Sequence, residues 1–458
     1  MLTKVISMRK PNGFSSKTLD PVLLLYIWAH YLQEQQPSEK KMIYAGIGKP
    51  SYLLNEDLAL AATNYWQELL EKVAQTKKLI TDTTLSPEEK CNWIASTSSA
   101  IDYDMPSGVQ KAQEMMAQAL TKWYSLQEPI DPCSIIFSVG GVSALNLVFG
   151  VINQRTPGGK IITPSPYYPF YNNAAHHNHP HFIDLSNEPG YRLTAEALKR
   201  SLKQVQEGQK IAAFLFCDPN NPMGYVVGKN EWKAIAEVLK TTSKDIPIIV
   251  DEAYAELTFG KKHISLLEVA PELKDRLILL RSATKGFSAS GERMAIMLCF
   301  NEEIREDLLN ATSISYVHAP ISLQIAYAQA MLAFTEKKRE ALSQYYQIQV
   351  EYVQKRLKKM NLALPDPSYA VEGTFYVVAN LSRLFGTKIP ERVADVIDTK
   401  GVISTDQEIS YALLFQDRMM ISPLSFFGAN PQLGYVRITC SGGIAELTEL
   451  LDRLEARL

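Results

Sequence analysis

Lys285 stands among residues whose types and order could give one lysine covalent chemistry. Ser282 precedes it in the run Ser-Ala-Thr-Lys, and Arg293 follows it in the run Gly-Glu-Arg. Earlier in the chain, Asn221 lies in an asparagine–proline turn and Asp251 ends an apolar run. A lysine amine is nucleophilic only when it is unprotonated, so a buried or cation-flanked lysine is the useful kind. This ordered set suits Lys285 to holding an aldehyde cofactor, whereas a lysine taken alone is an ordinary solvated charge.

Asp251, Tyr254 and Asn221 could contact the ring of such a cofactor. Asp251 closes an Ile-Ile-Val run, and a carboxylate there could pair with a protonated ring nitrogen and strengthen an electron sink. A strand-end cap is the alternative for Asp251. The hydroxyl of Tyr254 and the amide of Asn221 could both reach the phenolate oxygen of the ring, although a simple Asx turn would also explain Asn221.

A second group of residues could bind the phosphate of the cofactor. Gly140 and Gly141 join an apolar run to a helical pattern, where backbone N–H groups and the helix dipole can face a phosphate. Plain turn chemistry is the alternative for this pair. Ser282 and Arg293 could contact the same phosphate, Arg293 through its two-pronged guanidinium, unless Arg293 forms a surface salt bridge with Glu292.

Two further residues could stack on the cofactor or bind the substrate. Tyr168, in the run Ser-Pro-Tyr-Tyr-Pro, could stack on a flat cofactor and is preferred over Tyr167, with core packing as the rival explanation. Arg437 lies in a strand-like segment near the end of the chain, and its guanidinium fits a substrate α-carboxylate. An ordinary ion pair is the alternative for Arg437.

Composition narrows the class of protein. The chain has 458 residues, 46% of them hydrophobic, which is enough for a sizeable core and for two or more domains. A net charge of −2 gives no global field for nucleic acid or an anionic membrane, so we expect neither as a partner. The five scattered cysteines predict reduced thiols in a cytoplasmic protein without a zinc site. The histidines between 176 and 181 lack the partners of a metal motif, so we predict a loop and no metal there.

The middle of the chain alternates apolar runs with amphipathic stretches. This rhythm predicts an α/β domain with a mostly parallel sheet. The apolar stretch 134–152 is almost long enough to span a membrane, but its glycine pair favours a strand, a turn and a buried helix. The predicted strands are 135–139, 160–163, 181–184, 212–217, 247–250, 277–280 and 296–300.

The two ends of the chain predict a smaller α+β domain. We expect a helix from Pro21 to about 36 with Asp20 as its cap, an extended segment at 42–47, and one long helix or two across 322–360. Further strands are expected at 374–379, 418–421 and 436–439, and further helices at 56–80 and after Ser86. The predicted division is a large domain at 51–334 and a small domain formed by 1–50 and 335–458.

At these residues the chain resembles the fold-type I pyridoxal-phosphate enzymes, specifically the class I/II aminotransferases. The resemblance runs from about 44 to 440, and the motifs occur jointly and in order. The family's carboxylate-binding arginine matches Arg437, and Tyr103 resembles the tyrosine that reaches the phosphate in the neighbouring subunit. Its Asn-Pro-x-Gly, Asp-x-x-Tyr, Ser-x-x-Lys and Gly-x-Arg motifs match 221–224, 251–254, 282–285 and 291–293.

The resemblance implies a fold, a cofactor and a reaction. It implies a large domain with a mostly parallel seven-stranded sheet flanked by helices, and a small domain that closes over the active site. It also implies a homodimer with shared active sites, pyridoxal 5'-phosphate, and amino acid and 2-oxo acid substrates of amino acid metabolism. In the implied ping-pong transamination, Lys285 moves the substrate's Cα proton while Asp251 and Tyr254 support the cofactor.

The chain departs from the family pattern at several places. Many members have Gly-x-Gly-Glu-Pro where this chain has Gly-Ile-Gly-Lys-Pro at 46–50, which would put Gly48 at the substrate and Lys49 near the substrate side. Gly141 removes a hydroxyl that other members offer to the phosphate. The segments 64–100 and 382–415 are longer than expected. These departures concern substrate specificity and leave the cofactor chemistry intact.

Two alternatives stay open on the sequence alone. One is a pyridoxal-phosphate lyase or synthase that runs β- or γ-elimination, because the run at 165–169 also resembles aminocyclopropane carboxylate synthases. The other is a non-catalytic, cofactor-binding regulator. The intact Lys285, Asp251 and Arg437 disfavour the regulator, as does the lack of helix-turn-helix or basic character before the first motif.

Overall fold

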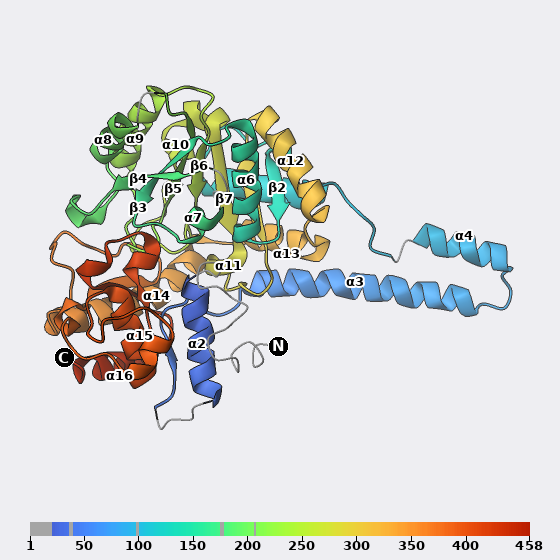
Figure 1. The fold of residues 1–458 in the computed structure, drawn as a ribbon. Coiled ribbons are helices and arrows are strands. Elements are labelled where there is room, and N and C mark those ends of the chain that lie inside the picture. The colour runs from blue at the N-terminus through green and yellow to red at the C-terminus, as the bar shows by residue number, and fades with distance from the viewer. Residues whose placement is uncertain (1–20, 36–39, 98–99, 175–177, 206–207) are drawn as a thin grey trace.

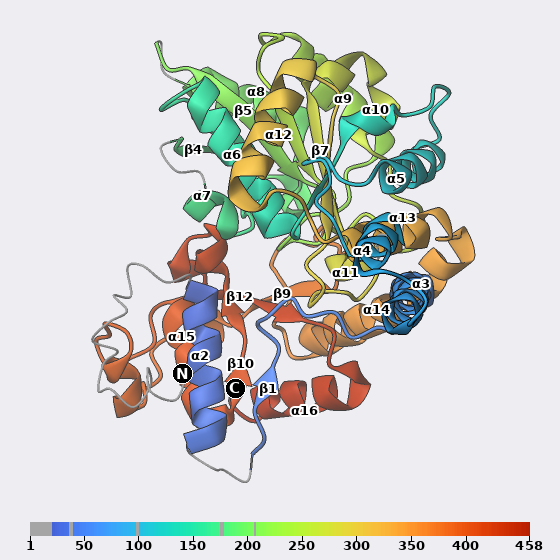
Figure 2. The same cartoon turned by 90° about the vertical axis from the view of Figure 1, so that its right-hand side faces the viewer.

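The computed structural model describes residues 21–35, 40–97, 100–174, 178–205 and 208–458. The predicted cap Asp20 and the histidines at 176 and 177 lie outside these ranges. Figures 1 and 2 show a sheet covered by helices and, beside it, a second part that combines the N-terminal helix with the C-terminal elements. No helix in the described ranges combines the length and apolar character that crossing a membrane requires.

A seven-stranded sheet forms the centre of the larger part, in the order β2-β8-β7-β6-β5-β3-β4. β8 runs antiparallel to both of its neighbours, and the other pairs are parallel. Continuous apolar runs suit such strands because helices cover both faces of the sheet. The predicted mostly parallel sheet is confirmed, with all seven strands close to the predicted positions. They are β2 (Ile135–Ser138), β3 (Lys160–Ser165), β4 (Pro180–Asp184), β5 (Ile211–Cys217), β6 (Ile248–Asp251), β7 (Leu277–Ser282) and β8 (Ala295–Cys299).

Helices pack on both faces of this sheet and form separate hydrophobic clusters with it. One cluster holds α6 (Gly141–Arg155), α7 (Phe170–Ala174) and α12 (Glu302–Tyr316). The stretch 134–152 is therefore a strand, a glycine turn and a buried helix, as predicted. The other cluster holds α5 (Gln110–Trp123), α8 (Ala195–Gln204), α9 (Lys229–Lys240), α10 (Leu266–Val269) and α13 (Ile321–Leu332).

The second part has a hydrophobic core built from both ends of the chain. Its strands form an antiparallel sheet in the order β11-β12-β9 and a short parallel pair, β1 with β10. Figure 2 shows α2 alongside α15, and the two helices are in contact. The elements are α2 (Pro21–Gln35), β1 (Ile43–Tyr44), α14 (Glu336–Lys359), β9 (Tyr376–Asn380), α15 (Asp406–Asp417), β10 (Met419–Met420), β11 (Ser422–Pro423), β12 (Tyr435–Thr439) and α16 (Gly443–Glu455).

Some predicted boundaries in this part shift. The extended segment expected at 42–47 is only the short β1, and the strand expected at 418–421 becomes β10 and β11. The stretch 322–360 forms two helices, the second of the two possibilities, because Thr335 caps the start of α14 by accepting a hydrogen bond from the backbone N–H of Lys338.

Two helices form an arm that projects from the body in Figure 1. The arm consists of α3 (Glu56–Thr81) and α4 (Pro87–Thr97), which pack on each other, while α3 also packs on α13. Asn55 caps α3 by accepting from the N–H of Leu58, and Ser86 and Glu89 cap α4 reciprocally. Both helices begin where the sequence predicts.

Candidate active site

A cavity of about 570 Å³ opens where the carboxyl ends of the parallel strands meet the second part of the structure. Ligands bind at this edge of open α/β sheets because loops and helix N-termini converge there. Most of the residues singled out from the sequence lie in its wall: Gly48, Gly141, Tyr168, Asn221, Asp251, Tyr254, Ser282, Lys285, Arg293 and Arg437. The structure therefore brings together residues that are up to several hundred positions apart in the chain.

Lys285 lies in the short helix α11 (Ala283–Gly286), directly after β7. Ser282 caps this helix by accepting a hydrogen bond from the N–H of Thr284 at 3.1 Å, which fixes the direction in which the lysine leaves the sheet. Its Nζ donates to the carbonyl of Gly48. Desolvation in the cavity, then the cations of Arg437 and Arg293, lower the pKa of Lys285 to about 7, against the opposing charge of Asp251. A substantial neutral fraction near neutral pH makes the amine a nucleophile and a base.

Asp251 ends β6 and is buried. Its carboxylate accepts hydrogen bonds from the hydroxyl of Tyr171 at 2.6 Å and from the N–H of Ala253 at 3.1 Å. Burial raises the pKa of Asp251, while both hydrogen bonds oppose that rise. These donors hold the carboxylate in one orientation. The structure adds Tyr171 to the site, although nothing in its sequence context had marked it.

Tyr254 and Tyr376 face each other with their hydroxyl oxygens 2.8 Å apart. Burial, followed by the proximity of Tyr376, raises the pKa of Tyr254 well above its usual value, so both phenols stay neutral donors. Gly48 packs against this pair, because a Cβ at that position would collide with the hydroxyl of Tyr376 and stand 3.5 Å from Nζ of Lys285. The close packing explains why position 48 holds a glycine.

Arg437, on β12, is a buried cation in the cavity wall. Its Nη1 donates to Oδ1 of Asn221 at 2.9 Å and its Nη2 to the carbonyl of Gly46 at 2.6 Å. The guanidinium carbon lies 4.1 Å from the ring centre of Tyr376 and 4.5 Å from that of Phe427. Its Nε has no hydrogen-bond partner, and no carboxylate in the described part of the chain pairs with it. A buried cation so arranged suits an incoming carboxylate.

Four residues converge at the other end of the cavity. Gly140 has φ +82°, and a Cβ there would collide with the guanidinium of Arg293, whose Cζ would lie 2.8 Å away. Gly141 begins α6, and a Cβ on it would lie 3.9 Å from Cβ of Ser282. Nη1 of Arg293 donates to the carbonyl of Ser290 at 3.0 Å, and the salt bridge with Glu292 that was the alternative does not form. A helix N-terminus, a hydroxyl and an arginine thus face one point, as an anion site requires.

With this geometry in place, the chain can be compared with known proteins. The model of the family "Aminotransferase class I and II" matches residues 56–454. The chain belongs to the class I and II aminotransferases. This family uses pyridoxal phosphate, and membership makes the protein an enzyme, a transaminase, as the sequence motifs predicted.

Individual relatives of the aminotransferase are distant in sequence. The putative aminotransferase YugH of Bacillus subtilis is 24% identical over 77% of this chain and 83% of its own length. A probable aspartate/prephenate aminotransferase of Rickettsia bellii is 28% identical over 72% of this chain and 76% of its own. The lyase alternative gains no support from these relatives.

Solved structures confirm the predicted fold. An aspartate aminotransferase from Rhizobium meliloti superposes with a TM-score of 0.77 at 20% identity, covering 97% of this chain and 99% of its own. An aspartate aminotransferase from Thermus thermophilus with maleate gives a TM-score of 0.74 at 20% identity, covering 98% and 100%. At this level of identity the likeness establishes the architecture of the aminotransferase alone.

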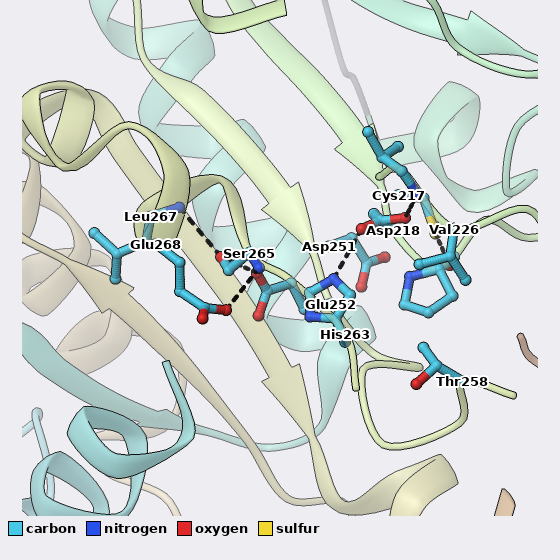
Figure 3. Close-up of polar contacts among 12 residues, drawn as sticks. Cys217, Asp218, Val226, Asp251, Glu252, Thr258, His263, Ser265, Leu267 and Glu268 are labelled. Atoms are coloured by element: carbon cyan, nitrogen blue, oxygen red, sulfur yellow. Dashed lines mark hydrogen bonds and ion pairs between the residues drawn. The ribbon is translucent and has the colours of Figure 1, made fainter. Parts of the chain in front are cut away.

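A group of buried polar residues lies around Asp251 in the aminotransferase (Figure 3). Oδ2 of Asp218 lies 2.8 Å from Nε2 of His263, and its Oδ1 accepts from the N–H of Val227 at 2.8 Å. Burial lowers the pKa of His263, but the hydrogen bond and charge of Asp218 outweigh it and leave the pKa above its usual value. Ser265 donates to Glu252 at 2.5 Å in the same group. The backbone N–H of Asp218 also donates to the carbonyl of Asp251 at 3.0 Å, which ties the turn that carries Asn221 to the end of β6.

The structure also shows where three other residues considered in the sequence analysis lie. Tyr168 lines the cavity and packs against Phe170, with ring centres 6.2 Å apart. Tyr103 lies outside the cavity of its own chain and is 82% exposed. Lys49, expected near the substrate side, is exposed and is not part of the cavity wall, although Gly48 beside it is; its backbone carbonyl accepts a hydrogen bond from the hydroxyl of Ser441 at 2.7 Å.

Sequence reasoning missed several residues of the cavity wall. Val22 and Leu23 come from the first turn of α2, and Phe427 ends a short 3-10 helix (Leu424–Phe427) between β11 and β12. Tyr376 lies in a strand that was predicted, but a strand pattern does not reveal which loop its side chain will meet. The apolar start of the N-terminal helix was the one available signal in the sequence.

Proposed function

We propose that this aminotransferase uses pyridoxal 5'-phosphate to move the amino group of an L-amino acid to a 2-oxo acid, with Lys285 as the catalytic residue. One observation carries the proposal. A lysine whose pKa is lowered to about 7 lies between an anion site around Arg293 and the buried cation of Arg437. Such an arrangement serves a reaction in which one amine must be neutral while two anionic groups are held on either side of it.

The residues present fit the cofactor. Gly140, Gly141, Ser282 and Arg293 would hold its phosphate, because the absence of a side chain on Gly140 lets the Arg293 guanidinium pack beside the start of α6, close to Ser282. The bound cofactor would supply an electron-withdrawing ring that stabilises negative charge at the substrate's Cα. Four other residues of the cavity wall would surround this ring: Asp251 at its nitrogen, Tyr254 and Asn221 at its phenolate oxygen, and Tyr168 on its face.

The chain's own residues then divide the work of the reaction. Arg437 binds the α-carboxylate and so turns the Cα–H bond toward the amine of Lys285. The neutral amine accepts the Cα proton and later returns a proton to complete the transfer. The hydrogen bonds from Tyr171 and Ala253 favour the ionised form of Asp251, which would face the ring nitrogen. Tyr376 keeps the hydroxyl of Tyr254 in place through their hydrogen bond.

We also propose the domain division predicted from the sequence, with 51–334 as the large domain and 1–50 with 335–458 as the small one. The clusters on the two faces of the seven-stranded sheet and the cluster built from both ends of the chain support it, and α2 belongs to the last of these. Lys285 is carried by the first part and Arg437 by the second, so closure of the small domain would bring Arg437 onto a bound carboxylate.

A homodimer with shared active sites completes the proposal. Tyr103, 82% exposed and outside its own cavity, would reach the phosphate bound by the neighbouring subunit. Ile101, Met105 and Ile314 are also exposed and apolar, and a second copy would cover them. We place the enzyme in the cytoplasm and in amino acid metabolism, without nucleic acid or membrane partners, on the strength of its scattered cysteines and small net charge.

Product analysis tests this function. Purified protein supplied with pyridoxal phosphate, an amino acid mixture and a 2-oxo acid mixture should form new amino acid and 2-oxo acid pairs. Release of ammonia without amino transfer would indicate elimination instead. Lys285→Ala should abolish turnover, whereas Lys274→Ala, at an exposed lysine outside the cavity, should keep it. Near-normal turnover by Lys285→Ala would exclude the assigned role.

A further inference from the structure

We propose that the amino acid substrate carries an apolar side chain and not a second carboxylate. The inference rests on the proposed function, because it takes Arg437 as the site of the α-carboxylate. On the side of the cavity that belongs to the second part of the structure, Arg437 is accompanied by Val22, Leu23, Ile47 and Phe427. A side chain that extends from a carboxylate bound to Arg437 would meet this apolar wall.

The N-terminal helix supplies half of that wall. α2 buries Leu25, Ala29 and Leu32 in the hydrophobic core of the second part, which fixes the helix against α15 and β10. Its first turn is left at the cavity, with Val22 and Leu23 in the lining. The helix thus has two apolar surfaces, one for the core and one, at its start, for the site.

Each lysine or arginine in the described cavity wall already has an ion-pair partner or a role in the proposed reaction. Arg281 is paired with Glu256 and lies 3.7 Å from Glu252, so its charge is matched within the protein. Arg293 belongs to the anion site beside Gly140.

The two other cations are committed as well. Lys285 must be neutral to react, and Arg437 is taken by the α-carboxylate. Lys49 is exposed and does not line the cavity.

The cavity should therefore favour substrates with apolar side chains over substrates with a side-chain carboxylate. A side-chain carboxylate would be desolvated against Val22 and Ile47 with no described lining cation left for it, which is strongly unfavourable. An aliphatic or aromatic side chain would bury its surface there, and each methylene in such a pocket changes specificity by about tenfold or more. Because both half-reactions use one site, the 2-oxo acid acceptor is expected to be apolar as well.

The chain therefore differs in side-chain preference from relatives that are named for aspartate. Several similar proteins and structures carry that name. Their likeness to this chain concerns the fold and the cofactor site, whereas side-chain preference depends on the wall that α2 and Ile47 form.

The first test compares donors in the half-reaction of the holoenzyme, followed by the absorbance change of the bound cofactor. L-Leucine, L-methionine and L-phenylalanine should each show a kcat/KM at least about tenfold above those of L-aspartate and L-glutamate. Equal or faster reaction of either dicarboxylate would overturn the inference while leaving the proposed function intact. If no amino acid changes the spectrum, the proposed function itself fails.

A binding test does not depend on turnover. The unreactive acids 4-methylpentanoate and succinate are titrated into the holoenzyme by calorimetry. The apolar acid should bind at least about tenfold more tightly than the dicarboxylate. Equal affinity, or tighter binding of succinate, would contradict the apolar wall.

Variants then connect the preference to the wall. Val22→Ala should lower the ratio of kcat/KM for L-methionine to that for L-alanine by about fivefold or more, because it removes two methyl groups from the lining. Ile47→Ala provides a second variant on another segment, should the first fail to fold. Ile27→Ala is the matched control, since Ile27 lies on the same helix but outside the cavity, and it should leave the ratio unchanged. An unchanged ratio in both Val22→Ala and Ile47→Ala would refute the proposal.

Discussion

The lowered pKa of Lys285 predicts how fast the aminotransferase without cofactor captures pyridoxal phosphate at each pH. Only the neutral amine attacks an aldehyde, and an ordinary lysine near pKa 10.4 is neutral in roughly one molecule in a thousand or fewer at pH 7. With a pKa of about 7, half of the Lys285 amines are neutral at that pH. The capture rate should therefore rise through a midpoint near pH 7 and level off above pH 8.

Two substitutions should move this midpoint in opposite directions. Arg437 disfavours the lysine cation, so Arg437→Gln should raise the midpoint by about one pH unit. Asp251 favours the cation, so Asp251→Asn should lower the midpoint. Opposite shifts would show that charge in the cavity, and not a general loosening of the structure, controls the amine.

The assay is stopped-flow absorbance after mixing the cofactor-free enzyme with pyridoxal phosphate between pH 5.5 and 9.5. The reaction of the same aldehyde with N-acetyl-lysine, measured in the same buffers, corrects for the ionisation of the aldehyde itself. A rate that keeps rising about tenfold per pH unit beyond pH 9 would refute the reasoning, because it would describe an ordinary solvated lysine.

Three further predictions follow from the other walls of the cavity. Asp251→Asn should lower kcat by about 10²- to 10³-fold, as expected for loss of about 3–4 kcal/mol of charge pairing, and steady-state kinetics with cofactor in excess would reveal an unaffected kcat if the role is wrong. Gly140→Ala should lower the free energy of unfolding, measured with urea, by about 1–3 kcal/mol and should weaken cofactor binding, because φ at this position is +82° and the added Cβ would strike Arg293. Gly150→Ala is the control: this glycine is helical, an added Cβ would meet no atom within 4 Å, and the substitution should not lower the stability of the protein. Tyr376→Phe should lower kcat by roughly threefold to tenfold through loss of a hydrogen bond of about 1 kcal/mol, and the absorbance of the bound cofactor should shift; identical spectra and rates would show that its hydroxyl does not position Tyr254.

The sheet could be predicted from the sequence because its strands are buried on both faces. Strand β6, for example, has three apolar residues and then the polar Asp251 at its carboxyl end. The glycine pair before α6 and the capped starts of α3 and α4 carry equally local signals. Elements in the second part were less predictable, because β1 and β10 are held by pairing between distant segments and not by their own pattern.

Site residues could be predicted where a local sequence motif marks them, and less well where a contact between distant segments places them in the site. Lys285, Asp251 and Arg437 stand in recognisable contexts. The bond from Arg437 to Asn221 joins positions 216 apart, and no local pattern encodes it.

Contacts of this kind also decided the outcomes that the sequence did not reveal. Tyr376 enters the site through such a contact, whereas the exposed Lys49 does not line the cavity although Gly48 beside it does.

The central claim is that Lys285 bonds the cofactor, and a chemical trap tests it most directly. The purified enzyme is incubated with pyridoxal phosphate, reduced with borohydride, digested and examined by mass spectrometry. We expect a phosphopyridoxyl group on the peptide that contains Lys285, and its loss when an amino acid substrate is added before reduction. A label on a different lysine, or no stable label at all, would show that Lys285 does not bond the cofactor.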